Sequence, residues 1–282
     1  MSNHHRSSPI IRPIAWFAFL SAMPAMTVHA QDRLLSDTQS PVARQQAAPS
    51  QITLRLEPIS QKVGSNSAVR RVGETPTARK TFTTDFALAE SPIAQSGAWQ
   101  HTGILWTHAR SIAHHAVGTQ TGSGGYDDSY AYLTGFGPDQ TVQATLWIDP
   151  AIAGNYREVE LLLRWADTPT SARGYECNPA WNGSYAQIVR WNGAYGNFTY
   201  ITNQTTFSPD IMPPGNGDIL TATMSGSTIH VYLNKNDGKG DQLIVTGSDM
   251  TYRNGNPGIG FFIQGLIDPA QFGFSSYTAS SH

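Results

Sequence analysis

The feature that most constrains the fold is a long alternation of apolar and polar residues, from Gln140 to Ser280. The runs are about eight residues long, and each ends at Gly, Asn, Asp or Pro. Alternation is typical of β-strands, and such turn residues join antiparallel neighbours. We therefore expect strands at about 141–148, 157–165, 173–177, 184–191, 197–202, 218–224, 228–233, 242–246, 258–264 and 271–279. The series predicts an all-β sandwich of two stacked antiparallel sheets, with a helical turn suggested only at Ser111 to Ala116.

The first thirty residues have the pattern of a secretory signal peptide. Arg6 and Arg12 lie in a polar, basic segment, the apolar run Ile14 to Val28 follows, and Val28-His29-Ala30 fits a cleavage site before Gln31. The alternative is a membrane anchor, but the run is shorter than the roughly 20 residues that a span needs, and Pro24 interrupts it. We expect a secreted protein, extracellular or periplasmic, with no membrane span after cleavage.

Residues 31–80 differ in composition from the rest of the mature chain. The segment 31–50 is rich in Gln, Ser, Ala and Pro and has no hydrophobic period, which is typical of a linker. Ile52 to Leu56 alternates and could form one short edge strand. The prediction is therefore a signal peptide at 1–30, a flexible tether at 31–80 and one globular domain at 81–282.

Charge and cysteine content exclude some classes of function. Removing residues 1–30 takes two of the 18 Lys and Arg and none of the 20 Asp and Glu, which leaves a formal charge of −4. This balance argues against a nucleic-acid binder, which needs a basic surface. Cys177 is the only cysteine, so no intramolecular disulfide can form, and it has no cationic neighbour in sequence. We expect a buried structural thiol rather than a nucleophile.

Several strand sequences follow one another in a characteristic order: TVQATLWI, EVELLLRW, GYEC, SYAQIVRWNG, DILTATMSGSTIHVYLN, DMTY, GNPGIGFF and FGFSSYTAS. This series resembles the concanavalin A-like lectin/glucanase superfamily, in particular its laminin-G-like and keto-disaccharide-hydrolase-like domains. The resemblance covers residues 82–282 and implies a two-sheet jelly roll. It does not specify an activity, because this fold carries lectins, hydrolases and lyases alike.

Alternation also assigns side chains to the two faces of a strand. In the strand at 157–165, one face has Val159, Leu161, Leu163 and Trp165, and the other has Glu158, Glu160, Leu162 and Arg164. The apolar face fits the inter-sheet core and the charged face fits an exposed concave sheet. Trp147, His230 and Tyr232 alternate with apolar residues in the same way, whereas both faces of 184–191 are mixed.

The expected function is non-covalent binding of a polysaccharide or glycan on that concave face. Aromatic rings stack on sugar rings, and Arg, Gln and Glu bind hydroxyls with directional hydrogen bonds. The predicted binding residues are Trp147, Glu176, Arg190, Trp191 and Tyr232. For any one of these aromatic residues, packing in the core is the competing interpretation. A structural or adhesive envelope protein, spaced by the tether, is a further alternative.

Catalysis is the alternative from another class, and a lyase acting on a uronate polymer is favoured over a hydrolase. Such a lyase needs a group that neutralises the carboxylate, a base and an acid. Arg164, Tyr185, Gln187 and His230 provide these residue types, but Val189 stands where alginate-lyase-type jelly rolls have a His. Glu158 and Glu160 lie about 6.6 Å apart along a strand and could notionally form a glycosidase pair, although the Glu-x-Asp-x-x-Glu run of jelly-roll glucanases is absent.

Calcium is the one cofactor that the sequence suggests. The segment Asn234 to Asp241 has oxygen ligands and glycines but lacks the spacing of an EF-hand, so a polar turn is the competing interpretation. The candidate ligands in this segment are Asp237 and Asp241, and Asp127, Asp128 and Asp249 are other candidates elsewhere in the chain. Sequons at Asn182, Asn197 and Asn203 would be used only in a eukaryotic host.

Overall fold

The computed structural model describes residues 79–102, 106–121, 128–150, 157–194, 196–208, 210–263 and 268–282. The chain divides into two compact units, Met1–Ala48 and Pro49–His282, and all the described residues belong to the second. The predicted signal peptide, the edge strand at 52–56 and the tether up to residue 78 therefore lie outside the described residues. In the described part of the chain, no helix is both long and apolar enough to cross a membrane.

The described residues form strands and a single short 3-10 helix. The first strands are β1 (Lys80–Thr84), β2 (Thr107–His108), β3 (Arg110–Ile112), β4 (His115–Val117), β5 (Asp128–Tyr132), β6 (Gln140–Ile148) and β7 (Arg157–Thr168). They are followed by β8 (Ser171–Pro179), β9 (Ala186–Gly193), β10 (Phe198–Gln204), β11 (Ile219–Ser225) and β12 (Thr228–Asn234). The last are β13 (Gln242–Ser248), β14 (Asn256–Ile263), η1 (Pro269–Gln271) and β15 (Phe272–Ser281).

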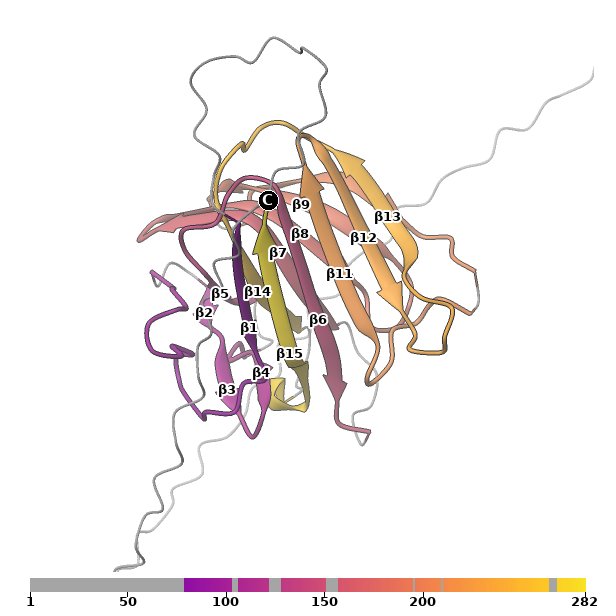
Figure 1. Ribbon diagram of the computed structural model, residues 1–282, viewed down its shortest axis with the longest axis horizontal. Helices are drawn as coiled ribbons and strands as arrows, with labels where there is room; N and C mark the ends of the chain where they lie inside the picture. The colour runs from indigo at the N-terminus through magenta and orange to yellow at the C-terminus, as the bar shows by residue number, and fades with distance from the viewer. Residues whose placement is uncertain are drawn as a thin grey trace, which may run out of the picture. The chain divides into compact units, whose positions relative to one another are not determined.

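The strands form two stacked sheets (Figure 1). The eight-stranded sheet has the order β13-β12-β11-β6-β15-β4-β3, with β1 also paired to β15. The seven-stranded sheet has the order β10-β9-β8-β7-β14-β5-β2, and only the short β2–β5 pair is parallel. Strands far apart in sequence are therefore neighbours, as where β7 lies between β8 and β14. The expected all-β sandwich of two stacked, mainly antiparallel sheets is confirmed.

The main hydrophobic core fills the space between the two sheets. Alternate residues of β6 (Val142, Ala144 and Leu146) and of β7 (Val159, Leu161 and Leu163) belong to it and are almost fully buried. Burial of these apolar side chains is the principal driving force for stacking the sheets. Cys177 is also fully buried here, so the expectation of a buried thiol is confirmed.

All the strands expected between residues 141 and 279 are present, with small shifts at their ends. The helical turn expected at Ser111 to Ala116 is wrong, because these residues form the β3–β4 hairpin. Ala113 and His114 at its tip both have positive φ, 42° and 67°. Two such residues let the chain reverse between strands with the right-handed twist of a hairpin.

A β-bulge in β7 overturns part of the predicted face assignment. The register of β7 with β8 shifts between Leu163 and Ala166, and Arg164 has a φ of 47°. The extra residue exchanges the faces beyond it, so Trp165 joins the cluster on the outer face instead of the inter-sheet core. Gly255 permits this geometry, because a Cβ there would lie 2.0 Å from the Arg164 carbonyl oxygen.

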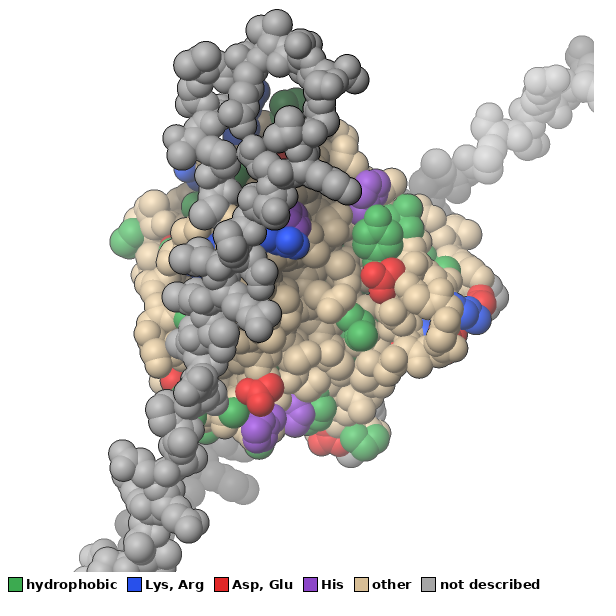
Figure 2. Space-filling view, viewed as in Figure 1, with side chains coloured by type: hydrophobic (Ala, Val, Ile, Leu, Met, Phe, Trp, Pro, Cys, Tyr) green, Lys and Arg blue, Asp and Glu red, His purple; other side chains and the backbone are tan. Residues whose placement is uncertain are grey.

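The face of the eight-stranded sheet that is turned away from the core carries few charged side chains. Figure 2 looks onto this sheet and shows few charged side chains and only scattered hydrophobic ones. The other sheet is different, because its outer face carries a second buried cluster of apolar and aromatic side chains.

Candidate functional site

A cavity of about 230 Å³ opens on the outer face of the seven-stranded sheet. Its walls combine carboxyl groups, amides and aromatic rings, drawn mainly from β7, β8, β9 and β10. The lining residues are Asp128, Glu158, Glu176, Tyr185, Gln187, Val189, Trp191, Phe198, Tyr200, Asn203 and Phe262. We call this cavity the carboxylate pocket. A smaller cavity of about 10 Å³ lies beside it and is lined by Glu160, Glu176 and Asp128 together with four aromatic residues.

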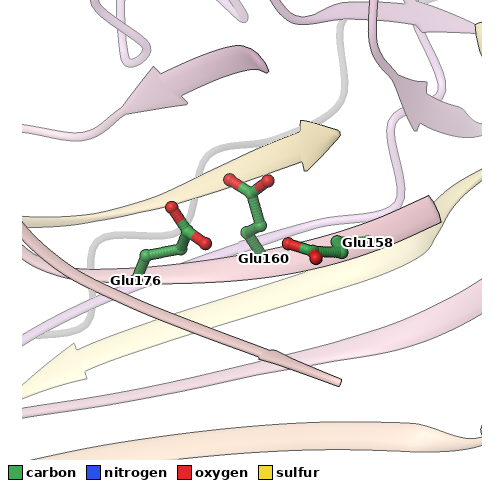
Figure 3. Close-up of side chains that lie close together, drawn as sticks. All are labelled: Glu158, Glu160 and Glu176. Carbon is green, nitrogen blue, oxygen red and sulfur yellow. The ribbon is translucent and has the colours of Figure 1, made fainter. Parts of the chain in front are cut away.

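Three glutamates form an acidic cluster at this site. Glu158 and Glu160 alternate on β7, and Glu176 lies on the adjacent β8, where it pairs with Leu162. Each offers a carboxyl oxygen, and these oxygens lie within 4.8 Å of one another. Figure 3 shows the Glu160 and Glu176 carboxyl groups rising from the same side of the sheet, with Glu158 beside Glu160. The period of two along each strand and the pairing of β7 with β8 bring them together.

Neighbouring donors orient two of these carboxyl groups. The Tyr185 hydroxyl and the Asn178 Nδ2 each donate to Glu158, one to each oxygen. The Trp191 indole Nε1 donates to Glu176 Oε2 over 2.6 Å. Hydrogen bonds of this kind favour the ionised carboxylate and fix its direction.

Burial dominates the electrostatics of the cluster. It raises the pKa of Glu158 above the ordinary glutamate range, and the hydrogen bonds from Tyr185 and Asn178 oppose the rise. Burial, and then the charge of Glu158, raises the pKa of Glu176. The pKa of Glu160 rises most clearly, through burial and then through the charges of Glu176, Asp128 and Glu158. The cluster therefore retains protons more readily than exposed glutamates do, unless a cation compensates its charge.

Aromatic rings form one wall of the carboxylate pocket. Trp191 packs edge-on against Trp106 with ring centroids 4.6 Å apart, and Phe198 lies 5.2 Å from Trp191. Tyr200 continues the row, 5.2 Å from Phe198, and is 55% exposed. The row therefore runs from the buried base of the pocket to its open mouth, where a ligand can reach the Tyr200 ring.

Four of the predicted binding and lyase residues line this pocket, namely Glu176, Tyr185, Gln187 and Trp191, and so does Glu158 of the notional glycosidase pair. The mixed strand at 184–191 thus turns Tyr185, Gln187 and Trp191 to the pocket, whereas Ala186 and Ile188 join the core.

The two predicted arginines lie elsewhere. Arg164 is buried, and its guanidinium donates to the carbonyl oxygens of Pro138, Gly226 and Tyr252 over 2.8 to 2.9 Å. Arg190 forms an ion pair with Asp249, with Nη1 and Oδ2 2.5 Å apart. Both guanidinium groups therefore tie strands to loops. The placement of Arg164 on the charged face of β7 is wrong, because of the bulge.

The remaining predicted residues belong to the other sheet. Trp147 on β6 stacks on His115 with ring centroids 3.9 Å apart. His230 on β12 contacts Thr246 Oγ1 through Nδ1 at 2.9 Å, and its ring lies 6.0 Å from that of Tyr232. The single groove expected from the sequence is therefore divided between two sheets, because alternation assigns a face but not a sheet.

The expected calcium ligands Asp237 and Asp241 of the β12–β13 loop and Asp249 beyond β13 do not form a group of potential metal ligands. The candidate Asp127 lies outside the residues that the structure describes. Asp249 accepts hydrogen bonds from Tyr175 and the Thr251 backbone and pairs with Arg190, while Asp237 pairs with Lys239. Asp241 accepts from the Asn234 amide at 2.9 Å. Within the described residues, the only group of three potential ligands is Glu158, Glu160 and Glu176.

Sequence reasoning missed Phe198, Tyr200, Asn203 and Phe262 as pocket residues, and it named Asp128 only as a candidate calcium ligand. Phe198 and Tyr200 occupy alternate positions of an expected strand, and their shared face was a usable signal. Asp128 and Phe262 face each other across β5 and β14, which are distant in sequence, and no local pattern shows that pairing.

Comparisons with known proteins find similarity in structure but not in sequence. No protein-family model matches the chain. No curated protein matches it either.

Three of the similar solved structures illustrate the range. The carbohydrate-binding module CBM66 from Bacillus subtilis is 15% identical, with a TM-score of 0.41, over 66% of this chain and 92% of that one. The Ca2+-bound VIP36 exoplasmic/lumenal domain is 9% identical, with a TM-score of 0.49, over 72% and 90%. The GH43 protein BlXynB from Bacillus licheniformis is 11% identical, with a TM-score of 0.44, over 71% of this chain but only 39% of its own. Similarity at this level concerns the two-sheet architecture alone.

Proposed function

We propose that this protein binds a glycan in the carboxylate pocket of the seven-stranded sheet. The observation that carries the proposal is the combination of an aromatic row that ends at the exposed Tyr200 with hydrogen-bonding groups beside it, Glu158, Glu176, Gln187 and Asn203. Aromatic rings pack on the apolar faces of sugars, and carboxylates and amides bind their hydroxyls. With about 230 Å³, the pocket accommodates a chain end or a small side unit rather than a long polymer segment.

The charge of the pocket supports a neutral or amino-bearing glycan over a polyuronate. Three of its lining residues are Asp or Glu, and Glu160 lines the adjoining small cavity. The lining residues that the structure describes include no Lys or Arg. Where these carboxyl groups are ionised and no cation compensates them, a uronate carboxylate would enter a field of like charge, which costs free energy. This also weakens the lyase alternative, since Arg164 is engaged by backbone carbonyls and His230 lies on the other sheet.

The test is binding of the purified full-length chain to an immobilised glycan panel that contains neutral oligosaccharides, amino-sugar oligomers and polyuronates. We expect retention on at least one neutral or amino-bearing glycan and none on polyuronates at moderate ionic strength. Retention on polyuronates alone, or on none of these glycans, would reject the proposal.

Glycoside hydrolysis is a second candidate, favoured by one observation. Glu158 and Glu176 both line the pocket, and one carboxyl oxygen of each lies within 4.8 Å of the other. Glycosidases that retain configuration hold an acid and a nucleophile at about 5–5.5 Å. Incubating the chain with each glycan that it binds, and measuring new reducing ends, tests this. Release that is abolished in Glu176→Gln would support hydrolysis, and absence of release would leave binding alone.

We also infer that the protein is exported before it meets this glycan. The inference is supported by the basic segment, the apolar run and the cleavage site at residues 1–30. Amino-terminal sequencing of the protein expressed in a secreting host is the test. A mature chain beginning at Gln31 is the expected result, and retention of Met1 in the exported protein would contradict it.

A further inference from the structure

The acidic cluster contains more buried acceptor oxygens than donors to satisfy them. The side chains of Tyr185, Asn178 and Trp191 donate hydrogen bonds to the cluster. The acceptors are carboxyl oxygens of Glu158 and Glu176. Two other oxygens, Glu160 Oε1 and Asn178 Oδ1, are buried without a hydrogen-bond partner among the described residues. Glu160 is 2% exposed and Asn178 is fully buried. A buried acceptor without a partner is costly, so both oxygens indicate a missing positive or donating group.

The Asn178 side chain is an independent indication of a missing ligand, because it is neutral. Repulsion between like charges therefore does not explain why its Oδ1 has no partner. It lies two residues after Glu176 on β8, and its Nδ2 donates to Glu158, which directs the amide into the cluster. On the antiparallel strand β7, the residue opposite Asn178 is Glu160. This register follows because Leu161 is paired with Cys177 and Glu158 with Ala180. The two oxygens without partners therefore come from adjacent positions of the same two strands.

The described part of the protein does not supply the counter-charge. The residues that line the two adjoining cavities include no Lys or Arg among those described. Arg157 is next to Glu158 in sequence, but its guanidinium lies over the Trp181 ring, 5.9 Å from the centroid. Buried carboxylates can be ionised together only where a positive charge compensates them.

We propose that Glu158, Glu160, Glu176 and Asn178 bind a divalent cation of the calcium class at the base of the carboxylate pocket. Ca2+ takes six to eight carboxylate, amide or water oxygens at about 2.3–2.6 Å, so two of its ligands can lie up to about 5 Å apart. One carboxyl oxygen from each of the three glutamates lies within 4.8 Å of the other two. The cluster has no thiolate or imidazole, which favours a hard cation over zinc or copper.

The site differs from the loop site that the sequence suggests, and it connects two central strands of the sheet. Bound Ca2+ would offset the repulsion between Glu158, Glu160 and Glu176 and satisfy the two oxygens without partners. It would also stabilise the folded chain by linkage, since the unfolded chain does not hold these ligands together.

The test is a calorimetric titration of the full-length chain with CaCl2, after treatment with a chelator and dialysis. We expect one saturable equivalent per chain and a higher Tm in the presence of Ca2+. Glu160→Gln keeps the size of the side chain and should weaken binding at least tenfold. Asp237→Asn is the matched control in the β12–β13 loop and should bind as the wild type does.

Three results would overturn the proposal. These are no saturable Ca2+ binding by the wild-type chain, equal affinity in the folded Glu160→Gln variant, or loss of binding in Asp237→Asn. If Glu160→Gln does not fold, Asn178→Ala serves in its place, because it removes the amide ligand without changing the net charge. Equal Ca2+ affinity in folded Asn178→Ala would then overturn the four-ligand site.

Discussion

The carboxyl group of Glu160 on β7 lies over Gly260 of the neighbouring strand β14. A Cβ at position 260 would lie 2.0 Å from Glu160 Oε2 and 3.0 Å from its Cδ. The two residues are paired in the β7–β14 register. The glycine therefore leaves the space that Glu160 fills, and the position of one charged group depends on a residue from a distant part of the sequence.

This contact predicts the effect of Gly260→Ala. The clashing atoms are the end of the flexible Glu160 side chain, so the carboxyl group can move away while the strands stay paired. We expect the variant to fold, with a small change in Tm without Ca2+, and to bind Ca2+ at least tenfold more weakly. Circular dichroism melting and calorimetric titration check the two parts. Wild-type Ca2+ affinity in Gly260→Ala would show that the Glu160 carboxyl group is not a ligand.

A second prediction concerns Arg164, whose guanidinium group binds backbone carbonyl oxygens of loops and does not line the carboxylate pocket. Arg164→Met leaves the buried carbonyl oxygens of Pro138, Gly226 and Tyr252 without their donors. We expect the free energy of unfolding to fall by about 3 kcal/mol, in the range for losing a buried, hydrogen-bonded charge. The exposed Arg253→Met is the control and should change it by less than about 0.5 kcal/mol. Urea unfolding of the two variants gives the comparison. Equal stability would mean that the carbonyl contacts contribute little.

A third prediction is the pH dependence of stability in the presence of a chelator. Burial raises the pKa of Glu158, Glu160 and Glu176 above the ordinary value of 4.5 in the folded chain. As the pH rises above about 4.5, the unfolded chain loses these protons first, so the folded state loses stability relative to it. The expected slope is about 1.4 kcal/mol per pH unit for each proton retained only by the folded chain.

Urea unfolding between pH 4.5 and neutral pH measures this slope. We expect stability to decline over the range without Ca2+ and to decline less in Glu160→Gln. A curve that is flat or rises in the wild type would show that the three carboxyl groups do not retain protons in the folded chain.

A fourth prediction concerns Cys177, which is fully buried in the inter-sheet core. Burial also raises the pKa of its thiol, so little reactive thiolate forms in the folded chain. We expect no reaction with a water-soluble disulfide reagent in the native state and one equivalent after denaturation. Rapid reaction of the folded protein would contradict the described packing around β8.

The fold was accessible from the sequence because alternation and turn residues are local signals. They predicted β6 to β15 and the opposite faces of Val159 and Glu160 on β7. They failed at Arg164, where the bulge adds one residue and exchanges the faces beyond it. A bulge of this kind depends on the neighbouring Gly255, which belongs to a segment distant in sequence.

The site was less accessible, because it depends on which strands are neighbours. His230 and Trp147 have the same alternation as Glu160, yet they lie on the other sheet. Glu176 was recognised as a binding residue, but its proximity to Glu160 follows only from the β7–β8 register. Pairing between strands, rather than pattern within one strand, assembles the carboxylate pocket.

The central claim is that the carboxylate pocket binds a glycan, and the exposed Tyr200 at its mouth gives the most direct test. The measurement is calorimetric affinity of the wild type, Tyr200→Ala and Leu243→Ala for the best neutral or amino-bearing oligosaccharide of the panel. Tyr200 is 55% exposed in the pocket, and Leu243 is 49% exposed on β13 of the other sheet. Stacking of a sugar on the Tyr200 ring contributes about 1.4 kcal/mol to the binding free energy, so Tyr200→Ala should bind roughly tenfold more weakly. Leu243→Ala should bind as the wild type does. Equal affinity of all three proteins would contradict binding in this pocket.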